Sequence, residues 1–457
     1  MSEEQRFSRG QKWSFGMGTF SVWFINSAFN TWVLSFYFAA IGLDITLIML
    51  AFVIWTLWNA INDPLIGYLS DRIRTRIGRR KPFIMLGTIP ILIIEIIVWL
   101  PPVGNQIVTF IYLLVILICY DTFYTMVNLF DALFPELYTS VKERSEVNTI
   151  KQILAIIGLI LAFLIPGLFI GETLSDPSGY PVNGIVTSII VGLSLVISIK
   201  WGAVEKEEFK FDHKHEFSFL KGMKYTLANK GFILYTIMFF LFEYILLLYG
   251  SVIPLWGENV LMVGSTLETS LLLGSIFIVG IISVVLWKYL DVKLGSRKSY
   301  AISMVVFVIT ILPLLFVSDF ITALITISAA GIGFGGMLYF IYLIIADVID
   351  EDELKTGVRR EGTFFGVTNF FMRLSMVVSV LSVSLVFVST GWETWTPNPD
   401  FDILLGIRLL MVLFPIIAIV LTLICLYFYP FTKSKVEEIK LKIMELHKKK
   451  RETVRST

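Results

Sequence analysis

The fold is decided by residues 58–82, which read WNAINDPLIGYLSDRIRTRIGRRKP. The stretch starts inside an apolar run and ends in a dense basic turn, after which the next apolar run begins at Phe83. Asp63 lies in the apolar part, where an ionised carboxylate is costly and is usually retained for function. Asp71 belongs to the charged turn. A buried acid followed by a basic turn between two membrane helices suggests a transporter.

The composition is that of a polytopic membrane protein. The 457 residues are 56% hydrophobic and 16% charged, with a mean hydropathy of +0.80, whereas soluble proteins carry about 25% charged residues. Apolar stretches long enough to cross a bilayer recur along the whole chain. The formal net charge of +1 gives no indication of a nucleic-acid partner. Cys119 and Cys425 lie in separate apolar runs and indicate no disulfide framework.

Twelve apolar segments are predicted to be transmembrane helices, because backbone groups in hydrocarbon must be hydrogen bonded within their own segment. The predicted spans are 14–41, 45–70, 82–101, 107–134, 149–171, 183–200, 231–256, 267–288, 298–318, 320–349, 362–389 and 403–429. The predicted organisation is an N-terminal six-helix bundle (1–200), a cytoplasmic central loop (201–230), a C-terminal six-helix bundle (231–429) and a basic cytoplasmic tail (430–457).

Basic residues alternate between the connections. Apart from Arg373 and Arg408, the Lys and Arg residues fall in the N-terminus, in every second connection or at its helix ends, or in the tail. The other connections contain none, namely 42–44, 101–106, 172–182, 257–266 and 390–402. The positive-inside rule therefore places both termini and the central loop in the cytoplasm of a multi-pass protein of the cell membrane.

The two halves repeat one charge pattern. After both the second and the eighth predicted spans, an acid is followed shortly by a glycine and basic residues. A second pattern, made of an acid and an arginine, follows the fourth and the tenth spans. Two such halves are expected in a two-bundle carrier. The candidate gating residues in these patterns are Asp71, Arg79, Arg80, Asp291, Arg297, Asp347 and Arg360.

Residues 59–64 (NAINDP) and 67–72 (GYLSDR) resemble the glycoside-pentoside-hexuronide:cation symporters, the group of the major facilitator superfamily that contains melibiose permease. Stretches 12–20, 132–136 and 346–350 are also similar. The resemblance covers both halves. It implies an all-α membrane protein of the major facilitator fold, with twelve transmembrane helices in two six-helix bundles related by an internal repeat.

In that family, a site for sodium, lithium or a proton lies between the second and fourth helices. The resemblance places it here at Asn59, Asn62, Asp63 and Thr125. The family's sugar carriers have an aspartate at the position of Asn59, so one of two carboxylates is missing there. From the residues themselves, oxygen ligands for a small cation cluster around Asp63; the alternative is that Asp63 only caps or pairs. We expect no cofactor and no metal centre, only Na⁺ or H⁺ as the coupling ion.

Polar residues within several spans are candidate substrate contacts. They are Trp23, Asn26, Asn30, Asp121, Tyr124, Asn128, Glu243, Asn369 and Arg373. The family's sugar-binding acids on the first and fourth helices correspond to Trp23 and, nearly, Asn128, and its lysine on the eleventh helix corresponds to Arg373.

Each of these candidates has a structural alternative. The polar stripe on the first span could serve helix–helix hydrogen bonding, and Asp121 could pair with Arg373 or Lys151. Glu243 and Arg373 lie at similar depth and could neutralise each other. Glu95 lies in an otherwise apolar span with no polar neighbour in sequence, which favours a structural role.

The predicted function is cation-coupled symport of a sugar, glycoside or related small polar solute by alternating access. One alternative is a carrier of lysolipids or other amphiphiles with the same fold, and another is a non-transporting membrane receptor or sensor. The sequence has no phosphate-binding loop and no catalytic Ser/His/Asp or Cys/His set, so it gives no catalytic residues and no support for an enzyme. We expect a monomer whose partners are the solute and membrane lipid, and a tail that forms an amphipathic helix on the anionic leaflet or is simply solvated.

Overall fold

The computed structural model describes residues 7–72, 75, 77–78, 80–138, 141–171, 173–203, 229–263, 265–356, 361–397 and 399–456. Within these ranges the chain is helical, without a β-strand. Arg79 and Arg360 lie outside the described residues, and the side chains of Asp71 and Asn369 are not described. The all-α fold class is as predicted.

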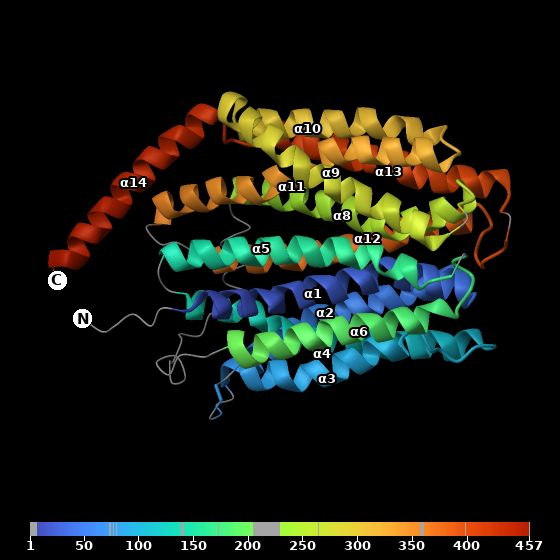
Figure 1. Ribbon diagram of the computed structural model, residues 1–457. Coiled ribbons are helices and arrows are strands. Elements are labelled where there is room, and N and C mark those ends of the chain that lie inside the picture. Colours follow the sequence, from blue (N-terminus) through green and yellow to red (C-terminus); the bar gives the residue numbers. More distant parts are fainter. Residues whose placement is uncertain are drawn as a thin grey trace. The chain divides into compact units, whose positions relative to one another are not determined.

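Six long helices form the first half of the chain (Figure 1). They are α1 (Arg9–Ser35), α2 (Ile45–Arg72), α3 (Lys81–Ile97), α4 (Gln106–Leu137), α5 (Val141–Leu164) and α6 (Gly179–Ile197). Three short segments extend them: the π-helices η1 (Phe36–Ala40) and η3 (Ser198–Gly202) and the 3-10 helix η2 (Pro166–Leu168).

The second half contains six further long helices and a tail helix. They are α8 (Lys230–Asn259), α9 (Thr266–Leu294), α10 (Ser296–Ile311) with the 3-10 helix η5 (Leu312–Leu315), α11 (Phe320–Thr356), α12 (Glu361–Ser389), α13 (Phe401–Phe428) and α14 (Lys433–Ser456). Helix α11 runs past its predicted end at residue 349.

These twelve helices before the tail correspond to the twelve predicted spans. Ten helices among the described residues are long and apolar enough to cross a membrane. The two others are α1, which carries a polar stripe, and α3, which has 17 residues. Both pack among the apolar spans, α1 along α5 and α6 and α3 against α4 and α6.

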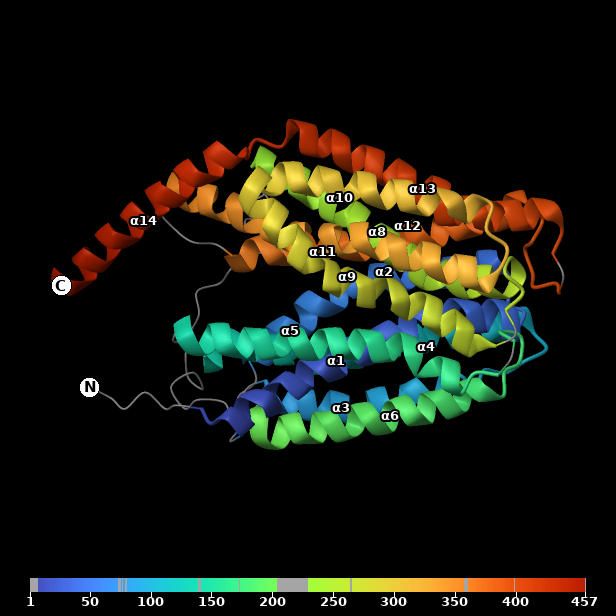
Figure 2. The ribbon, with the colours of Figure 1, turned by 45° about the horizontal axis from the view of Figure 1, so that its top comes forward.

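Two compact units make up the chain, and each is described by itself. Unit 1 consists of Met1–His213, Ile253–Leu271 and Ser384–Ile403, and unit 2 of Lys214–Val252, Leu272–Val383 and Leu404–Thr457. In unit 1, α1 packs along α5 and α6, and α4 packs against α2 and α3 (Figure 2). In unit 2, α11 packs against α10 and α14.

Close packing around α1 depends on small residues. A Cβ atom on Gly16 would lie 2.7 Å from Leu154, and one on Gly18 would lie 2.6 Å from Phe130. Since backbones can approach this closely only where no side chain intervenes, α1 is held deep among α4, α5 and α6. Most of its surface is therefore buried.

The connections that lack basic residues come together in unit 1. The ring of Phe38 lies 5.1 Å from that of Phe387 and 5.0 Å from that of Trp392, measured between centroids. The amide of Ile45 donates to the carbonyl of Glu393 at 3.0 Å. The end of α12 and the connection after it thus pack against η1 and the start of α2.

Candidate functional site

Five polar side chains of α2 and α4 meet in one cluster, namely Asn59, Asn62, Asp63, Asp121 and Thr125. Those on α2 lie within about one turn, and the two on α4 are four residues apart, so each set projects from one helix face. Asn62 is 1% exposed and Asp121 is 2% exposed. These two side chains are therefore removed from water, whereas Asn59, Asp63 and Thr125 are partly buried.

Hydrogen bonds join the two helices at this cluster. Nδ2 of Asn62 donates to Oδ2 of Asp121 at 3.0 Å and to the hydroxyl of Thr125 at 2.9 Å. The amide nitrogen of Asn59 donates to Oδ1 of Asp121. The hydroxyl of Thr125 donates to Oδ1 of Asp63 at 2.6 Å. Both carboxylates consequently belong to a single network.

The cluster is rich in oxygen. Oδ1 of Asn62 is buried and accepts no hydrogen bond from any described residue. Apart from Arg72 at its end, α2 has no basic residue, and α4 has none. Two carboxylates, a hydroxyl and an amide oxygen are hard ligands that suit a small cation, and such a cation would offset the cost of the buried Asp121 carboxylate.

The four residues predicted for the cation site are thus brought together by the structure. Asp121, which the sequence placed among the substrate contacts, lies in the same network. Lys151, a predicted alternative partner for Asp121, instead pairs with Asp131 at 2.8 Å. A signal for Asp121 was available, because it precedes Thr125 by four residues and therefore shares its helix face.

One face of α1 stays partly open. Between Phe20 and Thr31 the side chains that are not buried are those of Trp23, Asn26, Ser27 and Asn30, which recur at helical spacing. Trp23 is 39% exposed, and Asn30 donates from Nδ2 to Oδ1 of Asn26 at 3.0 Å. The predicted polar stripe is therefore a continuous, accessible face with an aromatic ring at one end.

On α4, the other predicted contacts follow Asp121 along the helix. The rings of Tyr124 and Tyr120 stack at 5.9 Å with an angle of 7°. Oδ1 of Asn128 is buried and has no hydrogen-bond partner in the described part of the chain. Asn128 thus offers an unsatisfied acceptor.

In unit 2, Glu243 on α8 is buried and Arg373 on α12 is half-buried. Asn369 lies on α12, one turn before Arg373. The ion pair between Glu243 and Arg373, and a substrate role for all three residues, stay predictions.

The repeated turns share a backbone feature. Gly78 has φ 115° and Gly295 has φ 84°, conformations that favour glycine. Around Gly78 the turn is closed by Thr75, whose hydroxyl donates to the carbonyl of Gly78 at 2.6 Å. The internal repeat read from the charges is thus present in the backbone of both turns.

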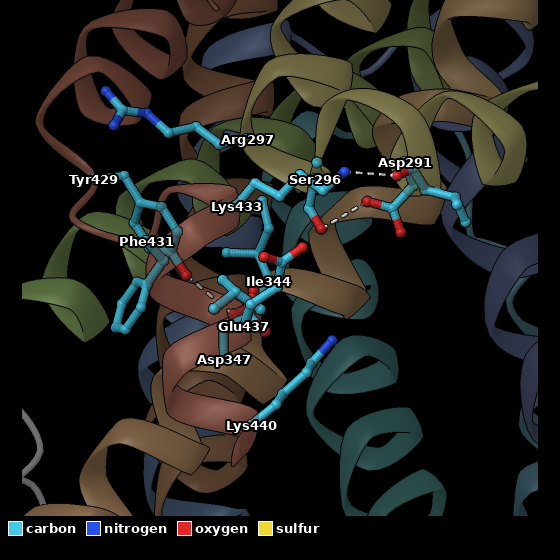
Figure 3. Close-up of a pocket in the computed structure, with 13 residues that line it drawn as sticks. Asp291, Ser296, Arg297, Ile344, Asp347, Tyr429, Phe431, Lys433, Glu437 and Lys440 are labelled. Atoms are coloured by element: carbon cyan, nitrogen blue, oxygen red, sulfur yellow. Dashed lines mark hydrogen bonds between the residues drawn. The ribbon is translucent and has the colours of Figure 1, made fainter. Parts of the chain in front are cut away.

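Asp291, Arg297 and Asp347 line one cavity of about 220 Å³ in unit 2 (Figure 3). Asp291 accepts a hydrogen bond of 2.7 Å from the hydroxyl of Ser296. Arg297 extends away from Asp291 in Figure 3 and donates to carbonyls at the end of α13, at 3.0 and 2.5 Å. Asp291 therefore binds the start of α10, whereas Arg297 binds the end of α13.

The tail forms the predicted helix, α14, and packs against α11. Lys433 donates to the carbonyl of Val292 at the end of α9 at 2.9 Å, a favourable place for a cation at a helix C-terminus. Ile439 and Ile443, on the predicted apolar face, are 3% and 7% exposed. This part of the face is covered by protein and is not available to lipid.

Comparisons with known proteins agree with this architecture. A family model described as MFS/sugar transport protein matches residues 14–433. The chain belongs to this family. As a member of the MFS/sugar transport family it is a membrane transporter of the major facilitator type, and not an enzyme.

Relatives of the family carry names of several kinds. The chain is 24% identical to "Uncharacterized symporter YnaJ" of Bacillus subtilis, with 94% of each chain covered. It is 24% identical to "Putative glycoside/cation symporter YagG" of Escherichia coli, covering 95% of this chain and 94% of the relative. It is 22% identical to "Sodium-dependent lysophosphatidylcholine symporter 1" of Xenopus tropicalis, covering 87% and 82%.

A crystal structure of the nucleoside transporter NupG superimposes with a TM-score of 0.64, at 12% identity, over 92% of this chain and 100% of NupG. At this identity the likeness shows the fold alone. It supports the predicted major facilitator architecture.

Proposed function

We propose that this MFS/sugar transport protein is a symporter that couples a cation to a sugar, a glycoside or a related small polar solute by alternating access. The observation that carries the proposal is the network in which Asp63 and Asp121 are joined by Asn62 and Thr125. Asp121 is buried and Asp63 is partly buried, and their carboxylates converge with hydroxyl and amide oxygens between two membrane helices, a ligand set that suits a small cation. The cation therefore belongs to the working state of the carrier.

Sodium suits this site better than a bare proton. A proton needs only one carboxylate, whereas the cluster also offers the Thr125 hydroxyl and Oδ1 of Asn62, which accepts no hydrogen bond within the described part of the chain. Neutral oxygens at such positions are useful for a metal ion that requires several ligands. Relatives that are named sodium-dependent symporters support the same choice.

The accessible face of α1 supports a hydroxylated solute. Asn26 and Asn30 each carry both donor and acceptor groups, and Trp23 adds an aromatic ring against which the apolar face of a sugar can pack. The relative named as a putative glycoside/cation symporter points to the same class of solute.

Lysolipid transport is the second candidate. It is favoured by relatives named as lysophosphatidylcholine symporters. In that case Arg373, whose planar guanidinium matches phosphate, would receive the headgroup. The receptor or sensor alternative is less well supported, since glycine turns with positive φ occur in both halves and the family is one of transporters.

Alternating access requires unit 1 to open and close at the side where the connections without basic residues lie. In the structure that side is held by the contacts of Phe38 with Phe387 and Trp392. We infer from the charge pattern that it faces the exterior, with both termini cytoplasmic. These contacts must break for solute and cation to enter from outside.

Uptake into proteoliposomes tests the proposal. The purified carrier is supplied with sugars, glycosides, nucleosides and lysolipids, with an inward sodium gradient, a proton gradient or neither. We expect uptake of a sugar or glycoside that is accelerated by sodium. If neither gradient changes the rate of uptake, the protein is a facilitator. Uptake restricted to lysolipids would establish lysolipid transport, the second candidate function.

A further inference from the structure

A third buried acid lies in unit 1, outside the α2–α4 network. Glu95, in the last turns of α3, has a fully buried side chain. Neither carboxylate oxygen has a hydrogen-bond partner among the described residues. The sequence favoured a structural role for this residue, yet a structural carboxyl is normally hydrogen bonded or paired.

Neutral and aromatic groups surround Glu95. Helix α6 approaches it so closely that a Cβ atom on Gly184 would lie 2.6 Å from the Glu95 carbonyl oxygen, and α6 has no charged residue. From α4, Tyr120 interacts electrostatically with Glu95. The Tyr120 hydroxyl is buried without a partner in the described chain, and its ring stacks on Phe29 with centroids 3.8 Å apart.

The titratable groups on the packed elements are few. Helix α4 contributes Cys119, Tyr120, Tyr124 and, near its start, Tyr112. Helix α6 contributes Tyr180, whose ring lies 5.5 Å from that of Trp99, and η3, which also contacts α3, contributes Lys200. The acids of α4 are Asp121, Asp131 and Glu136, and the other charged residue of α3 is Lys81 at its opposite end. None of the tyrosines can neutralise a carboxylate.

These surroundings decide the state of the carboxyl. The indole of Trp99, one turn further along the chain, is a neutral donor that acts on this carboxyl. An ionised carboxylate that has one neutral donor and no counter-charge on α4, α6 or the adjacent turns of α3 is costly in a low-dielectric interior, so burial favours the neutral form. A metal ion would need several oxygens around it. The oxygens described here are those of Glu95 and the Tyr120 hydroxyl, far fewer than the α2–α4 cluster provides. A proton, in contrast, needs only one carboxylate oxygen.

We propose that Glu95 is a proton-binding site of the carrier, separate from the α2–α4 site. Its carboxyl holds a proton while α3, α4 and α6 are packed as observed, and exchanges it with water when the end of α3 loosens. The exchange forms and breaks only the carboxyl O–H bond, and water carries the proton.

The end of α3 is held by few polar contacts that the structure describes. Two tyrosine hydroxyls hold it: Tyr37 donates to the carbonyl of Val98 at 2.9 Å, and Tyr112 donates to the carbonyl of Ile97. Glu95 lies within one turn of these carbonyls. Loss of two neutral hydrogen bonds, each of modest net strength, would admit water to the carboxyl.

Infrared spectroscopy of the purified full-length protein in liposomes tests this inference, and no transported solute is needed. At neutral pH the wild type should show a protonated-carboxyl band that shifts when water is replaced by D₂O. Glu95→Gln, which keeps the size of the side chain, should remove that band. Tyr37→Phe is the matched control, because it alters the same end of α3 but keeps the acid, and should retain the band.

Glu95→Asp provides a second variant if the Gln variant is not monodisperse, and it should move the band instead of removing it. Identical spectra for the wild type and Glu95→Gln would overturn the proposal, because the carboxyl would then be ionised. A band assigned to Glu95 that never shifts in D₂O would overturn it as well, because the site would not exchange its proton. Neither outcome depends on whether sodium or a sugar is transported.

Discussion

The hydroxyl of Thr125 on α4 donates a 2.6 Å hydrogen bond to Oδ1 of Asp63 on α2. It thereby links the carboxylate identified first in the sequence to a network that also contains Asp121. Because an oxygen that donates to one group can still offer a lone pair to a cation, Thr125 can both orient Asp63 and serve as a ligand.

Replacing Thr125 by Val should weaken sodium binding. The variant keeps the shape of the side chain but leaves Asp63 without this donor, a loss of roughly 1.5 kcal/mol for a hydrogen bond to a charged group. We expect the sodium concentration for half-maximal uptake to rise about tenfold. Thr125→Ser should stay close to wild type, and equal sodium dependence in the Val and Ser variants would remove the hydroxyl from the site.

Asp121→Asn should uncouple transport from sodium. Asn59 and Asn62 direct their amide nitrogens at Asp121, so the substitution removes the acceptor charge and places a donor against donors. We expect normal amounts of folded protein in the membrane but no acceleration of uptake by a sodium gradient. Asp131→Asn is the control, because Asp131 is a more exposed acid on the same helix that pairs with Lys151. Sodium-driven uptake at the wild-type rate by Asp121→Asn would exclude Asp121 from coupling.

Local helical spacing explains which parts of this site were predictable. Asn59, Asn62 and Asp63 lie within one turn, so their proximity followed from the sequence. The register between α2 and α4 could not be derived from the sequence, so the hydrogen bond from Asn62 to Asp121 was not expected; the substrate role of Asp121 stays a prediction. The twelve helices were predicted because each must satisfy its own backbone, whereas the burial of Ile439 on α14 depends on packing against α11 that no local pattern encodes.

Trp23→Ala should weaken solute binding with little effect on the sodium dependence. The ring is 39% exposed on the open face of α1, and an aromatic contact is worth about 1 kcal/mol. We expect KM for the transported solute to rise about fivefold while Trp23→Phe remains near wild type. An unchanged KM in the Ala variant would mean that this face does not contact the solute.

Phe38→Ala should favour opening of the side of unit 1 that lacks basic residues. The substitution removes three ring contacts, with Phe387, Trp392 and Trp395, each worth about 1 kcal/mol. In a background with Cys119 and Cys425 replaced by Ser, a reporter cysteine introduced by Asn26→Cys should react several-fold faster with an impermeant maleimide added outside intact cells. Phe38→Leu, which restores apolar bulk, should give an intermediate rate; no acceleration in Phe38→Ala would show that these contacts do not hold the closed side.

The most direct test of the account is the melting temperature of the purified wild-type protein in sodium chloride and in potassium chloride at equal ionic strength. A ligand that binds only the folded state stabilises it by about 2.7 kcal/mol when present at 100 times its Kd. The account predicts a melting temperature several degrees higher in sodium, and no difference between the salts for Asp63→Asn. The same melting temperature for the wild type in both salts would contradict a sodium site between α2 and α4.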